Sequence, residues 1–144
     1  MQYFIKLRND LQAKPANLTT SSKYTEMNGI IYLLAGALLI VWPGATQTIF
    51  MERAFVGDEQ GLIRAIGLTV VVIGWLYVFG GRSGGEQVVA ASVIDRLIFV
   101  PLVLVPLAIA GVFPHLLLTF VVLDVSLAIG ACMLIVRRRS CSLP

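Results

Sequence analysis

The sequence has 144 residues and a formal net charge of +3, and 58% of its residues are hydrophobic while only 13% are charged; its mean hydropathy is +0.88. Water-soluble domains are about 45–50% apolar and about 25% charged, and a small domain has too much surface for its volume to hide the excess. The composition therefore predicts an integral membrane protein and excludes a soluble enzyme, a disordered regulator and a disulfide scaffold.

Residues 1–26 are predicted to form a cytoplasmic tail. Phe4, Leu7 and Leu11 fall at helical spacing among charged residues, which fits a helix on the membrane surface and equally fits a solvated tail. The first apolar segment begins only at Met27 and lacks a small-residue cleavage pattern, so it does not resemble a signal peptide. We expect it to stay in the mature protein.

Four apolar stretches are long enough to cross about 30 Å of hydrocarbon as helices. They cover residues 27–42, 61–81, 87–112 and 115–136. The first ends at the helix-breaking pair Pro43-Gly44, and Pro101 and Pro106 are predicted to kink the third. The predicted fold class is all-α, an integral membrane four-helix bundle over residues 27–136, followed by a basic C-terminal tail at 137–144.

The distribution of basic residues predicts the orientation of this bundle. With a cytoplasmic N-terminus, one side of the membrane receives Lys6, Arg8, Lys14, Lys23, Arg82, Arg137, Arg138 and Arg139, and the other receives only Arg53 and Arg64. This positive-inside bias places both termini in the cytoplasm, or in the matrix or stroma of an organelle. The expected location is therefore a bacterial inner membrane or an organelle membrane.

The links between the spans differ in length, and they predict how the spans are arranged. Residues 82–86 and 111–114 form short links, which predict antiparallel neighbours. The link at 43–60 is longer and mixes apolar with charged residues. We expect it to lie at the membrane interface as a short amphipathic piece.

Small residues are predicted to make the contacts between helices, because lipid tails are as apolar as leucine and burial alone does not drive association. Gly67, Gly74 and Gly81 recur at seven-residue intervals along one face of the second span. Ser126 and Gly130 are four residues apart in the last span. We interpret both patterns as structural packing positions rather than as a dedicated dimer motif.

Four ionisable residues lie inside the predicted spans, where charge is costly and marks a candidate functional site: Arg64, Asp95, Arg96 and Asp124. Asp95 and Arg96 diverge by about 100° on a helix, so Arg96 needs another partner. Its depth differs from that of Asp124 by about 5 Å, and we predict that these two pair. Alternatives are a contact between Arg64 and Asp124 at an offset of about 9 Å, a network of all three, or an Arg64 that snorkels outward. We favour a role in bundle registry over proton relay or ligand binding.

The residue inventory shows no evident catalytic, metal or cofactor site. His115 is the single histidine, which excludes bis-His haem or a zinc cluster built by one chain. Cys132 and Cys141 form no CxxC pair, and no phosphate loop occurs. Tyr77 is interpreted, like other aromatics near span ends, as an interfacial residue. Topology accounts for the positive charge without a nucleic-acid partner.

Three strings within residues 60–136 resemble a known family. They are Gly74-Trp75-Leu76-Tyr77 followed by Gly80-Gly81-Arg82, then Ala91-Ser92-Val93-Ile94-Asp95-Arg96-Leu97, and finally Leu123-Asp124. Together they are similar to the small four-helix BphX-like proteins, which group with DoxX-like membrane proteins. The resemblance implies a four-helix membrane protein with Asp95, Arg96 and Asp124 in the matching strings and, through DoxX-like relatives, a link to quinone-linked redox complexes. It supplies no catalytic mechanism.

From these features we expect a structural or accessory subunit in the lipid bilayer, associated with itself or with other membrane-protein subunits. Nothing in the sequence points to an enzyme, although one is not excluded, and no cofactor is expected. One alternative is a binder of a lipophilic small molecule, such as a quinone or lipid, near Pro101, Pro106 and the charged cluster. Another is a minimal proton-coupled transporter.

Overall fold

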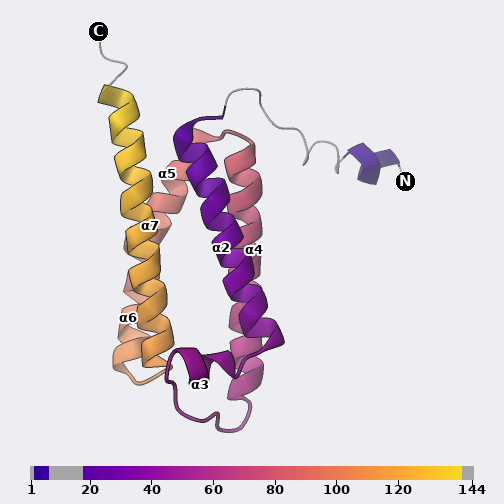
Figure 1. Cartoon of the computed structure of the whole chain (residues 1–144), viewed down its shortest axis with the longest axis vertical. Coiled ribbons are helices and arrows are strands. Elements are labelled where there is room, and N and C mark those ends of the chain that lie inside the picture. The colour runs from indigo at the N-terminus through magenta and orange to yellow at the C-terminus, as the bar shows by residue number, and fades with distance from the viewer. Residues whose placement is uncertain (1, 7–17, 141–144) are drawn as a thin grey trace.

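The computed structural model describes residues 2–6 and 18–140, with side chains up to Arg137. These residues are helical or in links, and no strand occurs among them. Four helical stretches are long and apolar enough to cross a membrane: α2 (Thr20–Val41), α4 (Glu59–Arg82), the third stretch (Glu86–Ile109) and α7 (Pro114–Ser140). A short helix, α3 (Ala45–Ile49), lies in the link between α2 and α4 (Figure 1).

The helix α2 begins inside the segment expected to be a tail. The hydroxyl of Thr19 accepts a hydrogen bond from the backbone N–H of Ser22 at 3.1 Å and so caps the first turn. Residues 20–26 are therefore helical. The expected N-terminal surface helix includes Leu7 and Leu11, which fall outside the described residues, as does Cys141.

The third stretch contains one widened turn. It consists of α5 (Glu86–Ile94), the π-helical turn η1 (Asp95–Phe99) and α6 (Val100–Ile109). The N–H of Val100 donates to the carbonyl of Asp95, five residues back. Pro101 follows at once; it has no N–H to donate and its ring would crowd the carbonyl of Leu97. The wider turn accommodates this proline within a continuous helical stretch.

Glycines bring α2 and α4 into backbone contact. They recur at seven-residue intervals on both helices, as Gly29 and Gly36 on α2 and Gly67, Gly74 and Gly81 on α4. A Cβ atom on Gly29 would lie only 2.6 Å from the backbone nitrogen of Val78, and one on Gly36 only 2.6 Å from the carbonyl oxygen of Gly67. No side chain fits between the two helices at these positions, so glycine is required for their close approach.

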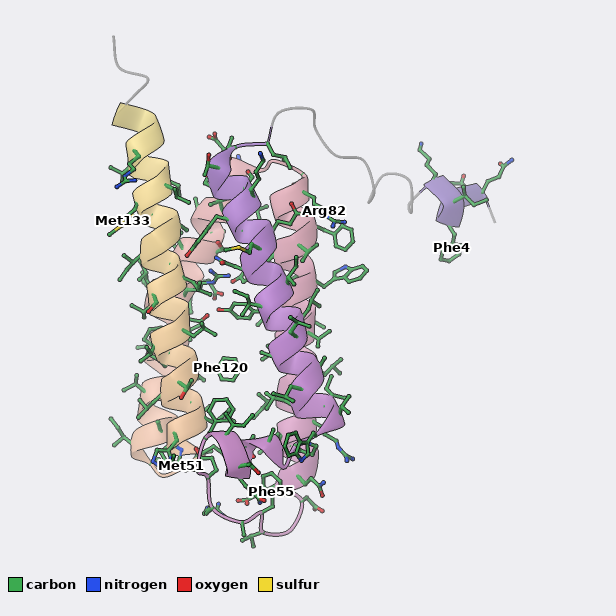
Figure 2. All side chains as sticks on the ribbon, viewed as in Figure 1. Phe4, Met51, Phe55, Arg82, Phe120 and Met133 are labelled. Atoms are coloured by element: carbon green, nitrogen blue, oxygen red, sulfur yellow. The ribbon has the colours of Figure 1, made fainter. Side chains whose placement is uncertain are left out.

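The two remaining long helices pack differently. The segment α6 packs along α7, whereas α5 contacts α2, α4 and α7 (Figure 1). Figure 2 shows Phe120 of α7 in the space between α7 and α2, and Phe55 and Met51 at the end of the bundle near α3, opposite Arg82. We call these two ends the α3 end and the Arg82 end. An apolar core that includes Leu39, Ile63 and Leu116 fills the bundle towards the α3 end.

The link that contains α3 is anchored in the bundle and does not simply lie on its surface. Thr46 and Glu52 are buried, and a carboxylate oxygen of Glu52 accepts a hydrogen bond from the N–H of Leu116 at 2.8 Å. Met51 has a φ of 55°, which turns the chain so that Glu52 points inward. Because Leu116 lies in the first turn of α7, Glu52 caps that helix from a distant part of the chain. The link that we expect at the membrane interface is thus also bonded to the first turn of α7.

Candidate functional site

A buried arginine stands at the centre of a polar cluster inside the bundle. Arg96, on the π-turn, is only 1% exposed. Its guanidinium carbon lies 4.3 Å from the ring centre of Tyr77 and 5.0 Å from that of Tyr32. The two rings meet edge to face, with their centres 5.6 Å apart. The cation is therefore held by two aromatic faces in a low-dielectric interior, where cation–π attraction is strongest.

Hydrogen bonds complete the surroundings of Arg96. With the Asn28 amide oriented so that both of its polar atoms are satisfied, its oxygen accepts from Nη1 of Arg96 at 3.1 Å and its nitrogen donates to the Tyr24 carbonyl at 3.3 Å. The Tyr77 hydroxyl donates to Asp95 at 3.2 Å. Nε and Nη2 of Arg96 make no hydrogen bond within the described part of the chain. The guanidinium is thus only partly satisfied.

The predicted ion pair between Arg96 and Asp124 is wrong for this structure. No such pair occurs among the described side chains, and Oδ1 of Asp124 has no hydrogen-bond partner there although the residue is only 4% exposed. Asn28 and the two tyrosine rings are instead the partners of the guanidinium. Arg64 is exposed on α4 and joins no ion pair with a described residue, so it does not belong to the cluster.

A cavity of about 390 Å³ lies beside this cluster. Helices α2, α4 and α7 and the third stretch all contribute to its wall, which is mainly apolar and includes Ile66, Val70, Phe99, Leu104, Leu117 and Phe120. The polar groups on this wall are Tyr32, Thr69, Asp95 and Asp124. The hydroxyl of Tyr32, like Oδ1 of Asp124, has no hydrogen-bond partner within residues 18–140. Two unpartnered buried oxygens therefore belong to residues that line one apolar cavity.

The cavity opens sideways, towards the surface that faces lipid if the helices cross a membrane. Three of its lining residues, Thr69 on α4, Phe99 on η1 and Val103 on α6, are also exposed on the outside of the bundle. The opening follows from the packing, because α6 lies along α7 and does not close against α4. A second hollow of about 570 Å³ lies between α4 and α5. Asp95 lines both.

Ser126 and Gly130, the two predicted packing residues of α7, differ in their surroundings. Gly130 faces α2, and a Cβ atom there would collide with the hydroxyl of Tyr24. Ser126 is exposed, and its hydroxyl donates to the carbonyl of Val122 on its own helix at 2.6 Å. Ala128 and Ala131 are instead the fully buried small residues of α7. Ser126 is exposed because it lies on a face of α7 different from that of the buried Ala128.

Sequence reasoning missed three members of the cluster: Asn28, Tyr32 and Tyr77. Tyr77 was assigned to the interface, yet it is only 8% exposed and binds Arg96 inside the bundle. A signal was present, since Asn28 is the only amide in the first predicted span and Tyr32 follows it on the same helical face. A buried arginine needs such partners, and Asn28 and Tyr32 are the polar side chains of residues 27–41.

No protein-family model matches the chain, and no similar protein was found among curated proteins or solved structures. The resemblance to BphX-like and DoxX-like proteins therefore stays an expectation. Within residues 2–6 and 18–140, no three His, Cys, Asp or Glu side chains come together as a metal site would require. The cavity and the polar groups on its wall are the features of this structure that bear on function.

Proposed function

We propose that the chain is an antiparallel four-helix bundle of a bacterial inner membrane or an organelle membrane, with both termini on the cytoplasmic side. The positive-inside distribution of Lys and Arg supports this orientation. Gln60 lies in the first turn of α4 and Gln87 in the first turn of α5, and both are exposed. In the proposed topology these two positions lie on opposite sides of the membrane, so they form a matched pair for a test. In a cysteine-free background, a membrane-impermeant maleimide applied to intact spheroplasts should label Gln60→Cys and spare Gln87→Cys; the reverse pattern contradicts the orientation.

Within this topology, we propose that the protein binds a lipophilic small molecule in the cavity of about 390 Å³. The observation that carries the proposal is that Tyr32 and Asp124 line this cavity, each with a buried oxygen that has no partner in the described chain. Buried polar groups are almost always hydrogen-bonded, because leaving one unpaired costs about 1–3 kcal/mol. The polar group of an otherwise apolar ligand would hydrogen-bond to these oxygens, and its apolar body would pack against the rest of the cavity wall.

The size and opening of the cavity favour a ligand that comes from the bilayer. Small-molecule sites commonly have volumes of about 300–1,000 Å³ and mostly apolar walls with a few polar groups. The lateral opening at Thr69, Phe99 and Val103 would let a lipophilic molecule enter without crossing water. Quinones and lipids are candidate ligands on these grounds.

Native mass spectrometry of protein released gently from its membrane tests the proposal. We expect a retained small molecule, in stoichiometric amount, on the wild-type protein. Val70→Phe places a larger side chain in the cavity wall and should abolish retention, whereas Val72→Phe, on the same helix at a residue that is 50% exposed, should leave it unchanged. Equal retention by the two variants, or none by the wild type, would overturn the proposal.

An accessory role through association is the second candidate. It is supported by the exposure of Ser126, which leaves a small residue of α7 free to approach another helix. The same spectra report on this candidate, because a partner chain or a second copy adds a protein mass. A Ser126→Leu variant should reduce such an assembly, and an unchanged assembly would refute the role of this face.

A further inference from the structure

Two acidic side chains of the interior line the cavity, whereas the buried arginine does not. Asp95 and Asp124 line it, whereas no Lys, Arg or His is found among the residues of its wall. Arg96 belongs to the adjoining cluster, where Asn28 and the rings of Tyr32 and Tyr77 hold its guanidinium. Acidic and aromatic residues therefore line the cavity, and no basic residue does.

We propose that the ligand of this cavity is a lipophilic cation, a protonated amine with an apolar body. This inference rests on the proposed function and specifies its ligand class. The ammonium group would donate hydrogen bonds to the carboxylate of Asp124, which is only 4% exposed and has an unpartnered oxygen, and to that of Asp95. The apolar body would lie among the aliphatic and aromatic side chains of the wall.

The charge of the interior supports one cation. Asp95, Arg96 and Asp124 are the acidic and basic side chains of the cluster and the cavity wall, and when all three are charged their sum is one negative charge. An unbalanced charge in a low-dielectric interior is unfavourable. One bound monocation neutralises the group without displacing Arg96 from its partners. With a neutral ligand, only protonation of a carboxylate removes this charge, and an anionic ligand increases it.

The aromatic lining supports the same ligand class. Tyr32, Phe99 and Phe120 line the cavity, and aromatic faces attract organic cations through their quadrupoles. Arg96 shows this chemistry in the adjoining cluster, where a guanidinium is held against two tyrosine rings. The cavity wall likewise contains hydrogen-bond acceptors and aromatic rings, but it contains no Lys, Arg or His.

The test compares three probes that share one apolar cage and differ in charge: 1-adamantylammonium, 1-adamantanol and 1-adamantanecarboxylate. Full-length protein in lipid nanodiscs is titrated with each by calorimetry, and Val70→Phe, with its filled cavity, gives the background of partition into lipid. We expect the ammonium to bind at least about tenfold more tightly than the alcohol, as one charge-assisted hydrogen bond would provide. The carboxylate should not exceed the background.

Matched variants assign the preference to the carboxylates. Asp124→Asn keeps the size of the side chain and should remove the preference for the ammonium while changing alcohol binding less than about threefold. Asp58→Asn, at an exposed carboxylate outside the cavity, should behave as wild type. Circular dichroism checks folding, and Asp95→Asn provides a second variant if Asp124→Asn does not fold.

The outcomes separate the two proposals. If ammonium and alcohol bind equally above the background, the inference about charge is overturned and the cavity remains a binding site. If the preference for the ammonium survives in both Asp→Asn variants, the inference is also overturned. If wild-type protein binds none of the probes above the Val70→Phe background, the proposed function fails, and the ligand class fails with it.

Discussion

Substitution of Gly74 by alanine should separate α2 from α4. A Cβ atom at this position would lie 2.7 Å from the backbone nitrogen of Leu33 and 2.8 Å from the carbonyl oxygen of Gly29. Ordinary contacts begin at 3.4 Å, so the backbones must move apart by about 0.7 Å at this point, the difference between 3.4 and 2.7 Å. Both clashing atoms belong to backbone, so no change of rotamer relieves the contact. Overpacking of this kind costs about 1–3 kcal/mol.

The matched control for this substitution is Gly61→Ala on the same helix. A Cβ atom at Gly61 meets nothing within 4 Å, and alanine should be neutral or favourable there by up to about 1 kcal/mol of helix propensity. Unfolding in mixed micelles with rising SDS mole fraction, followed by far-UV circular dichroism, measures both variants. If Gly74→Ala is as stable as Gly61→Ala, the close contact between α2 and α4 is not present in the folded protein.

Two further predictions concern the polar groups. Arg96→Lys should lower the free energy of unfolding by about 1–3 kcal/mol in the same titration, because a lysine ammonium cannot rest on two rings and bond Asn28 as the planar guanidinium does; wild-type stability would refute this account. Glu52→Leu should cost about 0.5–2 kcal/mol by removing the cap of α7, and Glu52→Gln should cost less because its amide oxygen still accepts from Leu116. Equal effects of the two Glu52 variants would show that the cap is not what stabilises the helix.

The sequence was sufficient to predict the helices, because each depends on a local property. Long apolar stretches without charge clusters can satisfy their backbone in a bilayer only as helices, and four such stretches are found in the structure. The early start of α2 was missed because it depends on the hydroxyl of Thr19, whose cap lies outside the apolar segment. The hydrogen bond from the N–H of Leu116 to Glu52 was also missed, since it joins residues 64 positions apart in the chain.

The polar site was only partly predictable. Its ionisable members, Asp95, Arg96 and Asp124, stand out in any apolar segment because their burial is costly. Their partners could not be assigned by depth alone: rise per residue places Arg96 near Asp124 but contains no information on the direction in which each side chain points. That direction depends on the π-turn and on the packing of α2, which supplies Asn28.

The π-turn also determines how the chain tolerates a change in its length. A turn with i to i+5 hydrogen bonds holds one residue more than an α-helical turn. Deleting a single residue between Asp95 and Phe99 would therefore remove this extra residue and leave a regular α-helical turn, with α6 in nearly its present rotation relative to α5. A deletion within α5 would instead rotate everything after it by about 100° and turn Val103 and Leu104 away from the cavity wall. The π-turn is thus the place in this stretch where the chain can lose one residue without changing which face of α6 looks inward.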